Sequence, residues 1–285
     1  MHSRRTSYFV DEATAARIER AEAELMAACS SAVGSRFGVE HFQVAVRGGF
    51  ATFAGADSPY NKVSGVGFAG IPDDHELSEM EARFAEHDAP VSFEVAALAD
   101  PALVERLSSR GYRLVSFEDV LVRDLVDPPE VKADGVVVRR EPADVDDSWI
   151  RAWLDTVVEA SLQPDTQGLA QHEEFSREVL EQAELAGFDA GVRTYLALVD
   201  GVPAGGAGVR LVNGIAQMAG AGTVPAYRRR GVQTALVAAR LEDAAAAGCD
   251  LAVVTTQPGS PSHANTQRMG FDLGYTRAVL VKEVR

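Results

Sequence analysis

The feature that most constrains the fold is a repeat that links the two halves of the sequence. Residues 111–114 (Gly-Tyr-Arg-Leu) match residues 270–273 (Gly-Phe-Asp-Leu) at an offset of 159, and residues 120–125 match residues 279–284 at the same offset. Each match runs from a helix-ending glycine through an aromatic residue into a strand-like segment. Two ordinary helix-to-strand junctions could agree by chance, but an ungapped match spaced half a chain apart favours two tandem copies of one fold.

The length of the chain and a pair of prolines agree with two domains. The chain has 285 residues, and about 150 residues is a common domain size. The segment Asp127-Pro128-Pro129-Glu130 is the best linker candidate, because consecutive prolines cannot continue a helix or a strand ladder. We therefore predict one domain at residues 1–128 and a second at residues 134–285.

Hydrophobic periodicity and turn signals indicate a mixed α/β architecture in both halves. A first helix begins after Asp11 and ends near Gly34, whereas residues 55–62 resist assignment. The dipeptides at 200–201 (Asp-Gly) and 213–214 (Asn-Gly) are type I′ hairpin signals, so three strands form a meander. The other helices are expected at about 76–87, 101–110, 144–162, 169–186, 231–247 and 261–269, and the strands at 41–46, 50–54, 65–68, 91–95, 114–122, 136–138, 195–199, 204–212, 215–224, 251–255 and 273–284. The fold class predicted for each domain is α/β, with a mixed, mostly antiparallel sheet flanked by helices.

Composition limits the partners and the compartment. The formal net charge is −15, and a negative field repels phosphate backbones, so nucleic acid is not expected as a partner. Cys29 and Cys249 stand far apart without a Cys-x-x-Cys, which excludes a disulfide scaffold or zinc ribbon and fits a reducing compartment. The start of the sequence does not read as a signal peptide, and no apolar stretch reaches about 18 residues. We expect a cytoplasmic protein with no metal and no membrane partner, and an oligomer is compatible with the sequence.

The chemistry concentrates where a strand meets a helix, at residues 223–236 (Thr-Val-Pro-Ala-Tyr-Arg-Arg-Arg-Gly-Val-Gln-Thr-Ala-Leu). A helix N-terminus offers unpaired N–H groups and the positive end of a dipole, which both favour a phosphate. Gly231 lets the backbone approach such an anion. Cations at a helix start are normally unfavourable, so Arg228, Arg229 and Arg230 favour an anionic ligand over a plain solvated basic patch. The spacing fits neither a Walker P-loop nor a dinucleotide fingerprint.

This segment resembles the acetyl-CoA signature of the GNAT acyltransferase superfamily, Arg/Gln-x-x-Gly-x-Gly/Ala. Residues 228–233 match its Arg and first Gly and depart from it at Gln233. The order of elements over residues 134–285 and the ending Met-Gly-Phe at 269–271 are similar to the family, whereas the first half shares only its ending and lacks the signature. The resemblance implies acetyl-CoA as co-substrate, with the pyrophosphate on the loop amides and the acetyl carbonyl and pantetheine arm at the strand end. The cofactor-binding residues implied in this way are Thr223, Val224, Arg228, Arg229, Arg230, Gly231, Val232, Gln233 and Thr234.

The resemblance leaves the proton-transfer groups open. Many relatives have a general-acid tyrosine at the position of Thr266, so Ser262 and His263 are the catalytic candidates on that helix. An exposed helix-start position without a catalytic role is the alternative for His263. The strand expected to carry a carboxylate base, at residues 215–222, has none, and Gln217 cannot accept a proton.

Two functions remain. The favoured one is an acetyl-CoA-dependent N-acetyltransferase, in which an amine of a small-molecule acceptor attacks the thioester directly, because this chemistry depends mainly on positioning. The first half would then support the fold or wall the acceptor cleft, through residues 57–61. The alternative is a non-catalytic sensor or interaction protein that binds CoA or acyl-CoA, which the missing tyrosine and strand carboxylate favour. The sequence does not identify the acceptor.

Overall fold

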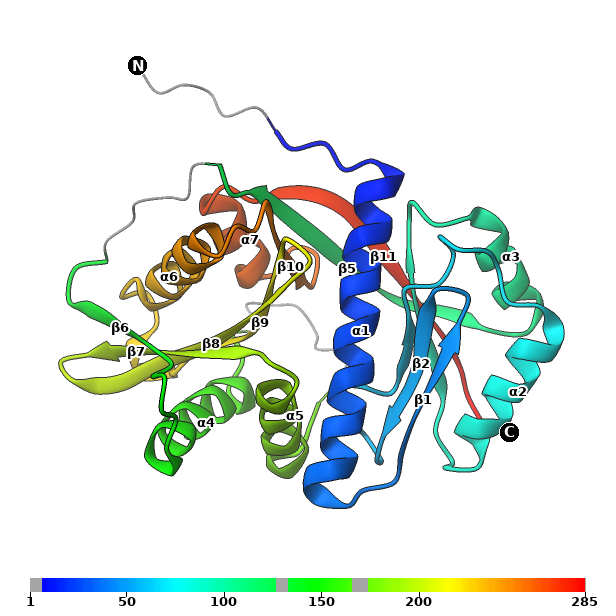
Figure 1. The fold of residues 1–285 in the computed structure, drawn as a ribbon, viewed down its shortest axis with the longest axis horizontal. Helices are drawn as coiled ribbons and strands as arrows, with labels where there is room; N and C mark the ends of the chain where they lie inside the picture. The colour runs from blue at the N-terminus through cyan, green and yellow to red at the C-terminus, as the bar shows by residue number, and fades with distance from the viewer. Residues whose placement is uncertain (1–6, 127–132, 166–173, 285) are drawn as a thin grey trace.

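A single sheet runs through both halves of the chain. The computed structural model describes residues 7–126, 133–165 and 174–284. Within these ranges 11 strands pair in the order β1-β2-β3-β4-β11-β5-β10-β9-β8-β7-β6, and helix α1 crosses the middle of the sheet (Figure 1). The elements of the first half are α1 (Glu12–Phe37), β1 (His41–Val46), β2 (Gly49–Ala54), β3 (Lys62–Ser64), α2 (Asp74–Ala85), β4 (Val91–Ala96), α3 (Pro101–Ser109) and β5 (Arg113–Asp124). Those of the second half are β6 (Val136–Arg140), α4 (Asp147–Leu162), α5 (Arg177–Asp189), β7 (Arg193–Val199), β8 (Val202–Val212), β9 (Ile215–Thr223), the short 3-10 helix η1 (Pro225–Tyr227), α6 (Val232–Ala246), β10 (Leu251–Thr256), α7 (Pro261–Arg268) and β11 (Asp272–Lys282).

Several helix boundaries differ from the sequence-based expectation by two or more residues, and those of α1 and α5 have a clear local cause. Helix α1 continues past Gly34 to Phe37, where Gly38 forms the left-handed cap. A β-carbon at Gly34 would collide with the ring of His41, so glycine serves there to let β1 approach the helix. The helix expected at 169–186 begins at Arg177, because Ser176 caps it; residues 166–173 lie outside the described ranges.

The loop after β3 corrects another expectation. Residues 65–68 are not a strand, because Gly65 and Gly67 adopt φ angles of 75° and 103°, which a strand does not allow. The strand is β3, three residues earlier, and it begins at the last residue of the stretch that the sequence left unassigned. The predicted linker at 127–130 lies outside the described residues.

The two halves exchange their last strands at the centre of the sheet. Strand β11 of the second half lies between β4 and β5, and β5 of the first half lies between β11 and β10. Two independent copies would instead place β5 beside β4 and β11 beside β10. The exchange extends to the cores: Leu121 of β5 is fully buried in the core of the second half, while Tyr275 and Leu280 of β11 are buried in that of the first half.

The pairing of β5 with β11 relates the two copies by a local two-fold axis. Glu118 and Arg277, which match in the repeat, lie opposite each other in the antiparallel register. The pairs on either side of them also exchange under the repeat, since Val120 lies opposite Tyr275 and Ser116 opposite Val279. Two copies of one fold, as the sequence repeat predicts, therefore meet about this pair.

Helix α1 fills the junction between the halves. It packs on β1, β2 and β3, and it also contacts β9 and α5 of the second half. Leu25, Met26 and Cys29 of α1 form a buried cluster with Ala186 of α5. Figure 1 shows α4 and α5 on one side of the second half of the sheet, with α6 and α7 on the other. In the described ranges, no helix has both the length and the apolarity needed to span a membrane.

Candidate functional site

The site begins where two parallel strands separate. Strands β9 and β10 pair only over Ile215–Gln217 and Leu251–Val253, and beyond these residues a cavity of about 150 Å³ opens between them. Residues 218–221 of β9 form one wall. The opposite walls come from β10, α6 and α7, with Val254, Thr255, Gln233, Val237, Ser262 and Thr266 among the lining residues.

A β-bulge in β9 faces this cavity. The register between β8 and β9 shifts, so that Gly220 and Ala221 together lie opposite Ala207, and Gly220 has a φ of 39°. A bulge leaves the extra residue outside the ladder and re-aims its backbone groups. By contrast, the N–H of Val224 donates to Ala204 O at 3.0 Å and is already used within the sheet. The bulge residues Gly220 and Ala221, which line the cavity, are therefore the backbone groups of β9 that the register shift re-aims there.

Helix α6 begins beside the same cavity without a side-chain cap. Gly231 is its N-cap, with a φ of 80° and no capping hydrogen bond within the described residues. The other six described α-helices begin with an Asp or Ser side chain that accepts an N–H of the first turn. The first-turn amides of Val232, Gln233 and Thr234 therefore lack such a cap and lie at the positive end of the helix dipole. This arrangement suits an anion.

The three arginines before α6 have different surroundings. The Arg228 guanidinium donates to Thr223 O at 3.4 Å and to Gln163 O, and so ties the loop to β9 and to the end of α4. Arg230 lies over the ring of Tyr227 and forms an exposed ion pair with Asp200. Arg229 is exposed, and its φ of 62° turns the loop toward the helix. Arg229 and Arg230 therefore remain accessible to a ligand at the helix start.

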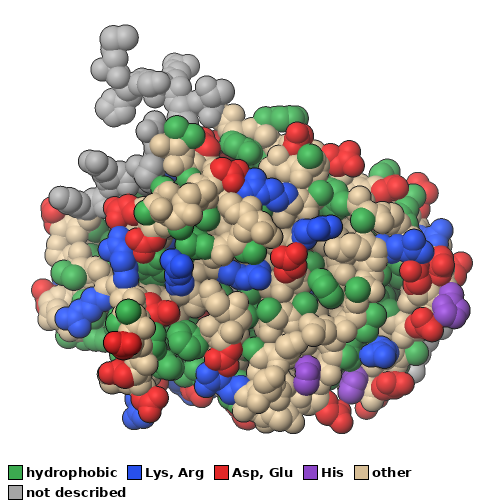
Figure 2. Space-filling view, viewed as in Figure 1, with side chains coloured by type: hydrophobic (Ala, Val, Ile, Leu, Met, Phe, Trp, Pro, Cys, Tyr) green, Lys and Arg blue, Asp and Glu red, His purple; other side chains and the backbone are tan. Residues whose placement is uncertain are grey.

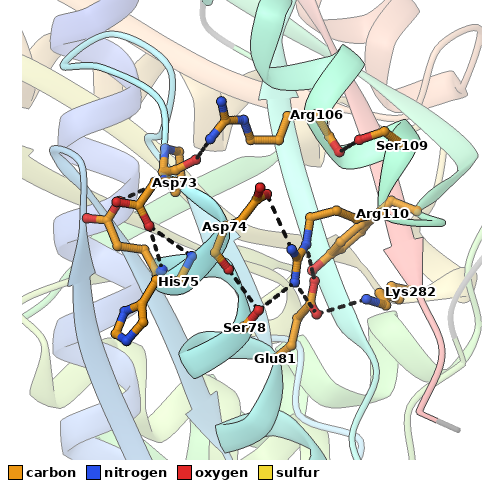
Figure 3. A network of polar contacts seen from close by, with 12 residues as sticks. Asp73, Asp74, His75, Ser78, Glu81, Arg106, Ser109, Arg110 and Lys282 are labelled. Atoms are coloured by element: carbon orange, nitrogen blue, oxygen red, sulfur yellow. Dashed lines mark hydrogen bonds and ion pairs between the residues drawn. The ribbon is translucent and has the colours of Figure 1, made fainter.

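The equivalent helix of the first half is closed by its own carboxylates. At the start of α2, Asp73 accepts the N–H groups of His75 and Glu76, and the Glu76 carboxylate accepts the N–H of Asp73. Figure 3 shows this cap and the ion pairs behind it, in which Glu81 pairs with Arg110, the C-cap residue of α3, and with Lys282 of β11. Carboxylates occupy here the amides whose counterparts in α6 have no side-chain cap among the described residues.

The structure separates the two catalytic candidates on α7. Ser262 lines the cavity, whereas His263 is not among the lining residues. The His263 side chain is only 13% exposed, and its Nδ1 lies 3.3 Å from Asp119 Oδ2 of β5, without hydrogen-bond geometry. The expectation of an exposed helix-start histidine is therefore wrong: the strand exchange brings Asp119 under α7. Thr266 donates its hydroxyl to Ser262 O at 2.8 Å.

A carboxylate that sequence reasoning missed lies at the bulge. A β-carbon built on Gly220 would lie 2.7 Å from Glu184 Oε2, so the Glu184 carboxylate sits directly against the bulge from α5. Burial alone raises the pKa of Glu184 to about 7, and no cation contacts it among the described residues. The sequence did indicate that Glu184 points inward, since it follows Leu180 by one helical turn on the inward stripe of α5. It did not indicate that this side chain meets β9, because the contact of α5 with β9 joins residues that are distant in the chain.

The fold and this site define an α/β protein that can hold an anion at a helix start and an extended arm between two strands. Residues 156–271 match the model of the Acetyltransferase (GNAT) family. The chain is similar to a GCN5-related N-acetyltransferase from Kribbella flavida, with 22% identity, a TM-score of 0.65 and coverage of 94% of this chain and 95% of that one.

Two further solved structures share the whole architecture. One is a tandem GNAT protein from the clavulanic acid biosynthesis pathway, with 16% identity, a TM-score of 0.60 and 97% of each chain covered. The other is a GCN5-related N-acetyltransferase from Sphaerobacter thermophilus, with 19% identity, a TM-score of 0.54 and coverage of 95% of this chain and 94% of that one. A comparison with curated proteins finds no match.

The matched segment is therefore a domain of the GNAT acetyltransferase family, and the chain as a whole has a tandem GNAT fold. This fold supports acetyl transfer from an acyl-CoA as a general class of chemistry.

Proposed function

We propose that the protein is an acetyl-CoA-dependent N-acetyltransferase whose acceptor is a small-molecule amine in the cytoplasm. The observation that carries the proposal is the uncapped start of α6 beside the cavity between β9 and β10. The pyrophosphate of CoA binds the amides of Val232, Gln233 and Thr234, with Arg229 and Arg230 beside it. The pantetheine arm then enters the cavity, and the first half, residues 1–128, supports the site without binding CoA itself.

The chemistry needs a carbonyl activator and a base. The bulge amides at Gly220 and Ala221 polarise the thioester carbonyl, in place of the strand-end amide of Val224, which is engaged. The acceptor amine attacks the carbonyl carbon, forming the C–N bond, and Glu184 accepts the proton that the nitrogen loses. The C–S bond then breaks, and CoA leaves as a thiolate that takes a proton from water, either directly or through the Ser262 hydroxyl, which passes on its own proton and regains one from that water. His263 supports the site indirectly, through its contact with Asp119.

The CoA site is tested by adding to α6 the second carboxylate of the α2 capping box. Thr234 occupies the third helical position, which Glu76 occupies in α2, so Thr234→Glu places a carboxylate beside the uncapped first turn of α6. Two like charges about 4 Å apart repel by about 4 kcal/mol at an effective dielectric constant of about 20. We expect the Kd for CoA, measured by calorimetry, to rise at least about 100-fold, while the melting temperature stays level or increases because the helix gains a cap.

The matched control is Thr234→Gln, which has the same shape without the charge and should keep the Kd within a few-fold. An unchanged Kd in Thr234→Glu would show that the CoA pyrophosphate does not bind at the start of α6.

Turnover separates the enzyme from a non-catalytic CoA-binding protein. With saturating acetyl-CoA and a panel of small amines, we expect thiol release above the rate of hydrolysis, together with an acetylated amine in the mass spectrum. Tight CoA binding without acetylation of any amine would instead favour the sensor or interaction protein.

A further inference from the structure

A second group of charged side chains lies between α1 and the centre of the sheet. Its hub is Arg277 of β11, which is 1% exposed and donates from Nε to Glu19 Oε1 at 2.7 Å. Arg277 Nη1 also lies 3.7 Å from Glu94 Oε2 and 3.7 Å from Glu118 Oε2. Lys62 pairs with the other oxygen of Glu94. The group therefore stands on the local two-fold axis, where β5 meets β11.

Among the described residues, two carboxyl groups of this region have no close cation of their own. Glu22 of α1 accepts a hydrogen bond from Gln217 Nε2 at 3.3 Å, and burial raises its pKa. Glu118 shares Arg277 with two other carboxylates and remains 31% exposed at its side chain. Burial and the charge of Glu94 raise the pKa of Glu118 to about 7. The Glu118 carboxyl group is therefore partly accessible to water, although burial disfavours its charged form.

Buried atoms without a hydrogen bond among the described residues lie at the same place. Glu94, which is 4% exposed, has an Oε2 that accepts no hydrogen bond within the described residues. The Nη2 of the fully buried Arg277 likewise has no acceptor there. Buried polar atoms are normally satisfied, so a network built only to fix α1 on the sheet would not be expected to leave both a donor and an acceptor unused.

The group adjoins the proposed acetyl-transfer site from the α1 side. Gln217, which holds Glu22, is the last residue of β9 that pairs with β10. Thr255, which lines the cavity, lies 3.4 Å from Arg277 Nη1. Four carboxyl groups (Glu19, Glu22, Glu94 and Glu118) surround Arg277 and Lys62. The neighbouring Arg210 donates to Gln217 and to Ala21 O rather than to a carboxylate, so the local charge favours a cation.

We propose that Glu22, Glu94 and Glu118, the axial acidic cluster, bind the distal ammonium group of an acceptor that carries two amino groups. The inference rests on the proposed function, because the other amine is the one acetylated at the β9–β10 cavity. The first half of the chain thereby selects the acceptor, through α1, β4 and β5, although it does not bind the cofactor.

Three probes of equal carbon-chain length test the proposal: 1,4-diaminobutane, butylamine and 4-aminobutanoate. With the whole protein and saturating acetyl-CoA, kcat/KM for the diamine should exceed that for the monoamine roughly 10- to 100-fold, the range expected of a charged hydrogen bond. The amino acid should be the poorest acceptor, since its carboxylate meets the axial acidic cluster. Equal kcat/KM values for all three would overturn the proposal.

Variants of the axial acidic cluster test whether these residues cause the preference for the diamine over the monoamine. Glu118→Gln and Glu22→Gln should each reduce the ratio of diamine to monoamine kcat/KM by about tenfold or more, mainly through KM. The control Glu105→Gln, on the exposed face of α3, should keep the ratio. Retention of the ratio in both cluster variants would place the second ammonium elsewhere.

Binding measurements, which do not require turnover, distinguish a failure of the proposed function from a failure of the axial acidic cluster. In thermal melts, 1,4-diaminobutane should stabilise the wild type more than butylamine does, and this difference should vanish in Glu118→Gln while calorimetric CoA binding persists. Loss of CoA binding in the wild type would refute the proposed function. CoA binding without a diamine-specific shift would refute the axial acidic cluster alone.

Discussion

Replacing Glu184 by Gln is expected to lower kcat with an amine acceptor by roughly 100- to 10,000-fold, the usual contribution of a general base. The carboxylate lies against the β9 bulge, and its pKa of about 7 is suited to accepting a proton near neutral pH. In the wild type, kcat/KM should therefore show an inflection near pH 7, with the rate rising as Glu184 loses its proton. The variant should lack this inflection, because glutamine does not titrate.

The same substitution is expected to stabilise the fold above neutral pH. Burial raises the pKa of Glu184 from 4.5 to about 7, so between these values the folded state binds more protons than the unfolded state. Stability consequently falls as pH rises from 4.5 to 7 and does not recover above 7. Glu184→Gln removes this penalty and should increase the free energy of unfolding at pH 8 by on the order of 1–3 kcal/mol, and the gain should disappear near pH 4.5.

Urea unfolding at pH 8 and pH 4.5 measures the difference in the free energy of unfolding between the wild type and Glu184→Gln. The control is Glu181→Gln, earlier on α5, whose side chain is 40% exposed and paired with Arg177; it should change neither kcat nor the pH dependence of stability. A structural role alone would make Glu184→Gln less stable, and retained activity with normal stability would show that another group accepts the proton. Only a group held in the site at a cost to the fold combines lost activity with gained stability.

The parts of the site that the sequence predicts are those encoded locally. The type I′ dipeptides at 200–201 and 213–214 form the expected hairpins, with positive φ at all four residues. The start of α6 at Gly231 follows from a glycine after three arginines, a pattern contained within one turn of chain. Local conformational preferences set these features, so a single segment is enough to infer them.

The parts that the sequence could not supply depend on partners distant in the chain. Glu184 becomes a candidate base only because α5 packs over the β9 bulge, and the partly buried His263 contacts Asp119, which comes from the other half of the chain. The sequence does not predict the exchange of β5 and β11 between the two halves, for a further reason. Strands β5 and β11 match in the repeat, so their patterns are equally suited to a place beside β4 or beside β10, and only tertiary packing decides between the two arrangements.

Cutting the chain in its predicted linker should leave neither half able to fold by itself. Both neighbours of β5 in the sheet, β10 and β11, belong to the second half, while β11 has both its neighbours, β4 and β5, in the first. Expressed separately, residues 1–128 and 129–285 would each expose an unpaired strand and lack side chains of their own core. We expect aggregation or non-cooperative unfolding of each fragment, because exposed strand edges and large apolar surfaces promote association.

Expressed together, the two fragments should assemble into a one-to-one complex that unfolds cooperatively and binds CoA with nearly the affinity of the intact chain. The linker contributes only to the effective concentration of the halves. Size-exclusion chromatography with calorimetry measures both properties. Leu121→Asp in the first fragment should prevent assembly, since Leu121 is 0% exposed within the core of the second half. Leu114→Asp on the same strand, at a residue that is 52% exposed, should permit assembly.

If residues 129–285 alone unfold cooperatively and bind CoA, β11 must pair with β10 in solution. The axial acidic cluster, which requires Arg277 to lie beside Glu94 and Glu118, would then not form.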